Sequence, residues 1–219
     1  MGYWGDFDNF VLMRKVERKP LAASMIGEIS DVYIYSGSAY TPTPEVSYID
    51  SAGQKVTLTP CGKNHVHDGT DCENDFYYTY KDIIDAGTAT VTVHAVPGSA
   101  YSGSADKTFT IARAELRGEL KISGTPEYGQ ELTADYTPDS GESVTYQWYR
   151  GSMDTPVSGA AGRTYMLTQD DIGQEIFVVV TADDGNHTGT VTSAPVTVAG
   201  TDAGTVLTLL VGKTIKKDV

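Results

Sequence analysis

The fold of this chain is decided by the stretch VTYQWYR, residues 144–150. Val144, Tyr146 and Trp148 stand at every second position in it, and the side chains of a β-strand alternate between its two faces. The three side chains are therefore predicted to share one face, with Trp148 in the core of a β-sandwich. The alternative for Trp148 is an exposed platform for a ligand.

Short alternating runs recur on both sides of this strand, separated by Gly, Pro, Ser and Asp, and almost no stretch has the periodicity of a helix. The earlier runs are DVYIYSG, PEVSYID, QKVTLTP, DFYYTYKD, TATVTVHAV and KTFTI, and the later ones include ELKISG, QELTADY, RTYMLT, QEIFVVVTADD and GTVTSAPVTV. Each series supplies the strands that a small sandwich needs. We therefore predict an all-β chain of two tandem sandwiches, residues 24–112 and 113–199. The connection IARAELRG is short and should restrict the angle between them.

The composition limits the partners of the protein. Of its 219 residues, 40% are hydrophobic, and the formal net charge is -13, which repels nucleic acid and anionic lipid surfaces. No run of about 18 apolar residues is present, so we expect no membrane insertion. The start of the chain lacks the basic and apolar regions of a signal peptide, so the N-terminus of a secreted protein would lie elsewhere. We expect a monomer whose partners are the neighbouring domains of a longer parent chain.

The second series resembles a bacterial immunoglobulin-like (Ig-like) domain. The resemblance lies in GELKISGTPEYGQELTADY, VTYQWYR, YMLTQDDIGQEIFVVVTA and TSAPVTV, where Leu167, Asp171 and Gly173 look like the corner before strand F. Antibody domains continue there with a tyrosine and a cysteine, whereas Glu175 and Phe177 stand in those positions here. The resemblance therefore implies a sandwich held by apolar packing alone. Its expected core residues are Val144, Tyr146, Trp148, Leu167 and Phe177, with Ile176, Val178 and Val180 beside them.

The first series resembles the MBG-type and related Ig-like repeats of secreted bacterial proteins. The resemblance is carried by YSGSAYTPTPEVSY, VTLTP, YTYKDIIDAGTATVTVHAV and YSGSADKTFTI. It implies a spacer or adhesion-type module, extracellular or on the cell surface, that brings no catalytic residues. Gly37, Gly87 and Gly103 fall at its turns, where a positive φ is expected.

One insertion departs from that repeat, PCGKNHVHDGTDCENDF at residues 60–76. Cys61 and Cys72 are the two cysteines of the chain, and such a pair in an extracellular β-protein usually forms a disulfide, which is the interpretation we favour. A second interpretation is a zinc site formed by Cys61, His65, His67 and Cys72, although the pattern lacks a CxxC knuckle. A third is a calcium loop with oxygen ligands from Asp68, Asp71, Glu73 and Asp75.

The two ends of the chain belong to neither predicted sandwich. Residues 1–23 contain GYWGDFDNFVLMRK, which resembles the last strand of a galactose-binding-like carbohydrate-binding module through Asp6, Asp8, Asn9, Phe10 and Leu12. This resemblance implies the remnant of a preceding module and a linker, and the alternative is an ordinary first strand of the first sandwich. Residues 200–219 are expected to form a tail or to open a further module.

Motifs of known catalytic sites are missing from the sequence. It contains no P-loop, no GxGxxG after a strand, no HExxH and no GxSxG, so we expect no enzyme activity and no cofactor in this chain. His94 and His187 are expected to be solvated. Tyr77, Tyr78 and Tyr80, close together on one strand, are candidates for binding a ligand.

These patterns favour a non-catalytic pair of spacer or adhesion-type modules from an extracellular bacterial multidomain protein with a carbohydrate-active parent. One alternative is a module that binds carbohydrate or protein, in which case the partner is a polysaccharide or a cell-surface glycan. Another is that the chain belongs to a secreted glycoside hydrolase whose active site lies outside it.

Overall fold

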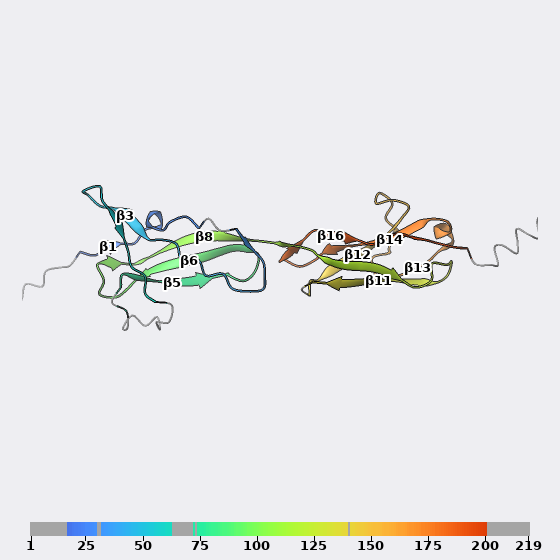
Figure 1. Ribbon diagram of the computed structural model, residues 1–219, viewed down its shortest axis with the longest axis horizontal. Coiled ribbons are helices and arrows are strands. Elements are labelled where there is room, and N and C mark those ends of the chain that lie inside the picture. The colour runs from blue at the N-terminus through green and yellow to red at the C-terminus, as the bar shows by residue number, and fades with distance from the viewer. Residues whose placement is uncertain (1–16, 30–31, 63–71, 73, 140, 201–219) are drawn as a thin grey trace, which may run out of the picture. The chain divides into compact units, whose positions relative to one another are not determined.

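The computed structural model describes residues 17–29, 32–62, 72, 74–139 and 141–200, and within them the chain is all-β, as predicted (Figure 1). The helical part consists of two 3-10 turns, η1 (Ala23–Met25) and η2 (Gln169–Asp171). Neither turn, nor any other helix in these ranges, has the length and apolar character needed to cross a membrane. The proposed N-terminal strand remnant and almost all of the proposed C-terminal tail lie outside the described residues.

The chain divides into two compact units. The first comprises the residues up to Val32, Ala39–Ile83 and Thr88–Thr110, and the second comprises Tyr33–Ser38, Ile84–Gly87 and the residues from Ile111 onward. The change of unit near residue 111 lies close to the expected boundary at residues 112 and 113. The second unit also includes two short segments from the N-terminal half of the chain, which the sequence pattern does not indicate.

The largest sheet of the N-terminal half has the strand order β2-β8-β6-β5. Its strands are β2 (Tyr33–Ile34), β8 (Ser104–Ala112), β6 (Gly87–Ala95) and β5 (Phe76–Lys81). β5 and β6 form an antiparallel hairpin, with Tyr77 opposite His94 and Thr79 opposite Thr92. Two further strand pairs are β1 (Lys19–Pro20) with β7 (Tyr101–Ser102), and β3 (Ser47–Ile49) with β4 (Lys55–Thr57).

Strand β6 shows why this sheet has one apolar and one polar face. Ala89, Val91 and Val93 are buried, while the threonines between them are partly or fully exposed. The alternation follows directly from the two-residue period of a strand. The core on the apolar side consists of Leu21, Met25, Ile26, Val46, Leu58, Phe76, Val93 and Tyr101. At the turns, Gly37, Gly87 and Gly103 have φ values of 71°, 143° and 76°, in the region that favours glycine.

The second unit has a three-stranded sheet and a four-stranded sheet. The first sheet contains β10 (Gly118–Ser123), β11 (Glu131–Pro138) and β13 (Thr164–Met166). The second contains β12 (Val144–Arg150), β14 (Glu175–Ala182), β16 (Thr190–Thr192) and β17 (Val196–Thr197). A short parallel pair joins β9 (Ala114–Glu115) to β15 (His187–Thr188).

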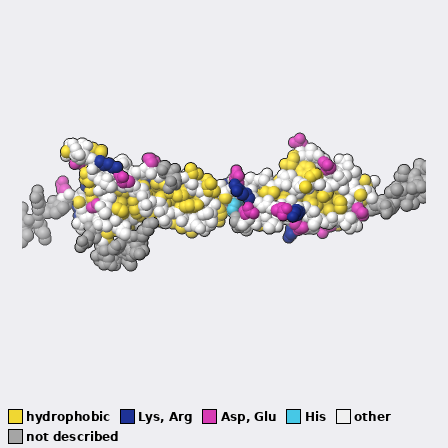
Figure 2. All heavy atoms as spheres, viewed as in Figure 1, with side chains coloured by type: hydrophobic (Ala, Val, Ile, Leu, Met, Phe, Trp, Pro, Cys, Tyr) yellow, Lys and Arg dark blue, Asp and Glu magenta, His cyan; other side chains and the backbone are white. Residues whose placement is uncertain are grey.

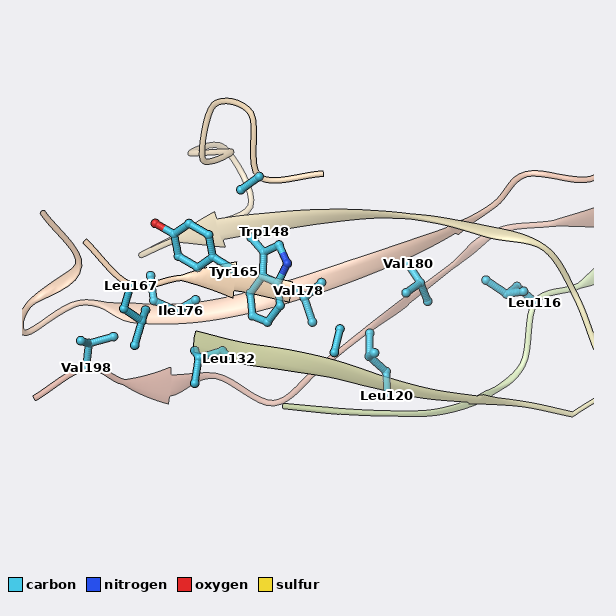
Figure 3. Close-up of a cluster of buried hydrophobic side chains, with 12 residues drawn as sticks. Leu116, Leu120, Leu132, Trp148, Tyr165, Leu167, Ile176, Val178, Val180 and Val198 are labelled. Carbon is cyan, nitrogen blue, oxygen red and sulfur yellow. The ribbon is translucent and has the colours of Figure 1, made fainter. Parts of the chain in front are cut away.

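Trp148 lies in the core of the second unit and is 0% exposed. Its indole nitrogen donates a hydrogen bond to the Gly162 carbonyl oxygen at 2.9 Å, so its only polar atom is satisfied. Figure 3 shows the ring beside Tyr165 and Val178, with Leu120 and Leu132 reaching the same cluster from the three-stranded sheet. This burial excludes the alternative of an exposed ligand platform. The other expected core residues Val144, Tyr146 and Leu167 also belong to or pack against this cluster.

Phe177 is buried, as expected, but it does not belong to the cluster around Trp148. Trp148 pairs with Val178 across β12 and β14, so Phe177, one residue earlier, points to the opposite face of the sheet. There its ring stacks on Tyr149 at 5.4 Å between centroids, and it remains only 8% exposed. A strand residue with low exposure is therefore not necessarily located between the two sheets, because side chains can cover either face of a strand.

Candidate functional site

The disulfide expected from the sequence is present between Cys61 and Cys72, with the Cα atoms 6.0 Å apart. The start of the insertion is tied to β5, because the Cys61 N–H donates to the Phe76 carbonyl at 2.7 Å. Both sulfurs are used in the bond, so neither can serve as a thiolate ligand, and the zinc interpretation loses two of its four ligands. His65 and His67 lie outside the described residues.

The calcium interpretation receives no support from the one ligand candidate that the structure describes. Asp75 accepts the Thr59 N–H at 2.8 Å through Oδ2 and so fastens the same end of the insertion. The other candidates, Asp68, Asp71 and Glu73, lie outside the described residues. Among the residues that are described, no group of three or more His, Cys, Asp or Glu side chains is arranged to hold a metal ion.

Two of the three candidate tyrosines take part in holding the first unit together. Tyr78 donates its hydroxyl to the Pro44 carbonyl at 2.5 Å, and Tyr80 donates to the Pro42 carbonyl at 3.0 Å. Burial is the main cause that raises the pKa of Tyr78 to about 12. Both hydroxyls thus fasten the segment that carries Pro42 and Pro44 to β5, and we no longer expect either residue to be a ligand platform.

Tyr77 lies on the other face of β5, where it stacks against His94 of β6. The two rings are 5.0 Å apart between centroids and inclined by 15°. The His94 Nε2 atom shares a hydrogen bond of 2.8 Å with Thr79 Oγ1, which fixes the imidazole plane. His94 is therefore partly buried and held on two sides, and the expectation of a solvated histidine is wrong.

The stacked pair is part of a polar surface that we call the outer face. It consists of the side chains that alternate away from the apolar core on β5, β6 and β8: Tyr77, Thr79, Lys81, Thr88, Thr90, Thr92, His94, Ser104, Asp106, Thr108 and Thr110. Thr92 donates its hydroxyl to Asp106 Oδ1 at 2.7 Å across β6 and β8. In Figure 2 the surface visible over β5 and β6 is mostly uncharged.

His187, also expected to be solvated, is buried and 6% exposed. Its Nδ1 atom lies 2.9 Å from both carboxylate oxygens of Asp184, and its Nε2 atom lies 4.0 Å from Glu142 Oε1. Burial by itself raises the pKa of Asp184, but hydrogen bonds from His187 and from backbone N–H groups outweigh it and lower the pKa to about 2. The burial of His187 could not be predicted from the polar residues around it in the sequence, because the pairing of β15 with β9 buries this side chain.

A fully buried carboxylate, Asp171, holds the corner before β14. It is 0% exposed and accepts hydrogen bonds from Arg150 Nε at 2.6 Å, Tyr165 Oη at 2.7 Å, and both the N–H and the hydroxyl of Thr168. Burial raises the pKa of Asp171, and the bonds from Thr168, Tyr165 and Arg150 together lower it below its ordinary value. Asp171 was expected at this corner, and the spacing Thr168-x-x-Asp171, which is that of a capping box, is a second signal in the sequence for the same corner.

The residues with notable chemistry in the described part of the chain fall into four groups: the cluster around the buried Asp171, the His187–Asp184 pair, the disulfide and the polar outer face. Every buried side-chain nitrogen or oxygen there has a hydrogen-bond partner. No protein-family model matches this chain, and no curated protein sequence matches it. The function is therefore argued from the residues themselves.

Proposed function

We propose that this chain is a pair of non-catalytic spacer or adhesion-type modules from an extracellular bacterial multidomain protein. The observation that carries the proposal is the use of the buried ionisable groups. Asp171 is held by Arg150, Tyr165 and Thr168, and Asp184 is held by His187, so these groups stabilise turns. A module whose charged side chains are used to stabilise its own fold is suited to a structural role.

Two further observations support this proposal. The disulfide between Cys61 and Cys72 is of a kind that persists in oxidising surroundings, in keeping with an extracellular protein. Strand β8 ends at Ala112 and β9 begins at Ala114, so one residue separates the last strand of one series from the first strand of the next. A connection this short favours a spacer over a flexibly tethered pair.

Force spectroscopy on the full chain tests the structural role. We expect two separate unfolding events, one for each unit, because each unit has its own apolar core. Cys61 and Cys72 are 11 positions apart in the sequence, and the intact bond holds their Cα atoms 6.0 Å apart, so reductant should lengthen the extension released by the first unit by roughly 30–34 Å at ~3.3–3.6 Å per residue. A single event for the whole chain, or extension without resistance, would contradict the proposal.

Glycosidase activity of this chain itself is tested separately, and a negative result leaves open a glycoside hydrolase parent whose active site lies outside the chain. We expect no turnover of a panel of aryl glycosides above the buffer blank, because the buried carboxylates are held in turns. Hydrolysis that survives repurification and is lost on substitution of one carboxylate would establish an enzyme instead.

A further inference from the structure

We propose that the second unit binds a second copy of the chain, with the two β10 strands paired edge to edge and antiparallel about Leu120. This inference goes beyond the spacer role and does not depend on it. It replaces the monomer expected from the sequence with a symmetric dimer. Two observations carry it, the open edge of β10 and the order of the charged residues along that strand.

Strand β10 is the last strand on one side of its sheet. The strand order is β10-β11-β13, so β11 covers one edge of β10. On the other edge, no hydrogen bond joins β10 to any residue that the structure describes. The strand is 6 residues long and contains no proline. Its open edge therefore presents backbone donors and acceptors to which another strand can add.

The register of the sheet identifies the backbone groups that point to this open edge. The Ala134 N–H donates to the Arg163 carbonyl at 2.9 Å, on the β13 side of β11. Successive residues of a strand direct their N–H and C=O groups to opposite edges, so Asp135 faces β10, where it is paired with Lys121. Leu120, the neighbour of Lys121, consequently directs its N–H and C=O groups to the open edge.

An antiparallel pairing about Leu120 satisfies these groups in both copies. Leu120 of each copy lies opposite Leu120 of the other, and the two residues exchange both of their hydrogen bonds. Gly118 and Ile122, two positions away on either side, also face the open edge and lie opposite each other across the dimer. The two three-stranded sheets then form one continuous sheet with two-fold symmetry.

The charges of β10 are complementary to themselves in this arrangement. Glu119 of each copy lies opposite Lys121 of the other, and opposite charges directly across a strand pair are stabilising. Both side chains are exposed, at 66% and 67%, and within one copy they form an ion pair at 2.8 Å. They can therefore turn to the second copy without uncovering a buried group. A pairing centred on Lys121 would place two lysines opposite each other, so the charges also select the register.

The edges of the other long edge strands, β5 and β12, are partly occupied. On β12, the Trp148 N–H donates to the Ala160 carbonyl at 3.0 Å, and the Val157 N–H donates to the Trp148 carbonyl at 2.9 Å. On β5, the Phe76 carbonyl accepts the Cys61 N–H at 2.7 Å. Of these three strands, β10 is the one whose outer edge has no hydrogen bond to described residues along its whole length.

Sedimentation of the full chain at about 10 µM to 1 mM tests the proposal, because an interface of one strand from each copy is small and therefore weak. The buffer contains about 0.15 M salt, which screens the repulsion between two copies with a net charge of -13 each. We expect the average mass to rise with concentration from 23.5 kDa toward twice that value.

Charge reversal on β10 tests the location of the interface. Lys121→Glu and Glu119→Lys each place like charges opposite each other at both symmetric contacts, so each should raise the dimer dissociation constant by roughly 10-fold or more. The double variant, Glu119→Lys with Lys121→Glu, restores opposite charges and should dimerise like the unchanged protein. The two single variants should also associate when mixed, because one presents acidic and the other basic side chains at the edge.

A matched control is Lys55→Glu, which makes the same change in net charge in the first unit. Lys55 is an exposed lysine that pairs with Glu45, and we expect this variant to dimerise like the unchanged protein. Circular dichroism checks that each variant is folded, and if one single variant does not fold, the other carries the test.

Three results would overturn the proposal. They are a mass of 23.5 kDa at every concentration, a dimer that neither single charge reversal weakens, and an equal weakening by Lys55→Glu. Failure of the double variant to dimerise would likewise reject the pairing about Leu120. None of these results bears on the unfolding of single molecules that tests the spacer role.

Discussion

Replacing Asp171 by asparagine should destabilise the second unit by about 3–5 kcal/mol. An asparagine of the same shape can place its oxygen toward Tyr165 and Thr168, or toward Arg150, but not toward both sets of donors. In the first orientation the amide NH2 group faces Arg150 Nε, which lies 2.6 Å from the carboxylate in the unchanged protein. The loss is then one charge-assisted hydrogen bond, about 1.5–3 kcal/mol, plus a buried unpaired donor, about 1–3 kcal/mol.

A matched control is Asp135→Asn, which changes the net charge by the same amount. Asp135 pairs with Arg163 at 3.1 Å, but both side chains are largely exposed, at 46% and 62%. An exposed pair of this kind contributes about 0–1 kcal/mol, so this variant should remain close to the unchanged protein. Comparing the two variants separates the effect of burying the carboxylate from the effect of changing the net charge.

The assay is guanidinium denaturation of the full chain at pH 7, followed by tryptophan fluorescence in a Trp4→Phe background, so that the signal comes from Trp148, which lies in the same core as Tyr165. Because the pKa of folded Asp171 is lowered, its stabilisation is complete above the ordinary aspartate pKa of about 3.9 and disappears as the pH falls below it. The Asp171→Asn variant should therefore lose less stability on acidification. A change in unfolding free energy within about 1 kcal/mol of that of Asp135→Asn would refute the role assigned to this carboxylate.

Three other predictions concern stability. Trp148→Ala should destabilise the second unit by about 3–5 kcal/mol and leave the unfolding of the first unit nearly unchanged, as seen by calorimetry, because the deleted ring is fully buried. Reduction of the Cys61–Cys72 bond should destabilise the first unit by roughly 3 kcal/mol and raise the intact mass by about 2 Da. EDTA should not change the thermal melt of the first unit. A melt that responds to EDTA and not to reductant would restore the zinc interpretation. Lowering the pH from the ordinary aspartate range toward 2 should destabilise the second unit as Asp184, whose pKa is about 2, becomes protonated. Asp184→Asn should flatten this acid limb, and an unchanged limb would count against the hydrogen bonds assigned to Asp184.

The strands themselves could be predicted because their signal is local. The alternation in TATVTVHAV and VTYQWYR marks two faces of each strand, and β6 and β12 lie where these runs predict them. The pairing of Cys61 with Cys72 could also be predicted, since the chain has two cysteines and they can pair in one way. Neither inference needs the position of any distant residue.

The sequence was least informative where the register between strands decides which face a side chain occupies. Phe177 is apolar and adjacent to core residues, yet its pairing opposite Tyr149 places it on the far side of the sheet. Tyr77 and Tyr78 are neighbours of the same type, but one lies beside His94 and the other donates to Pro44. A shift of one residue exchanges the two faces, so a sequence run without its partner cannot say which face is covered.

The sequence by itself determined that this protein is built from β-strands and where most of them run, and it favoured a disulfide in the insertion over a metal site. Only the tertiary structure decided that His187 is buried beside Asp184, that Arg150 and Tyr165 meet at Asp171, and that Tyr77 alone of three tyrosines lies on the outer face. The physical reason is the range of the interactions. Strand periodicity and cysteine count are properties of the local chain, whereas burial and hydrogen bonding depend on which distant segments pack together.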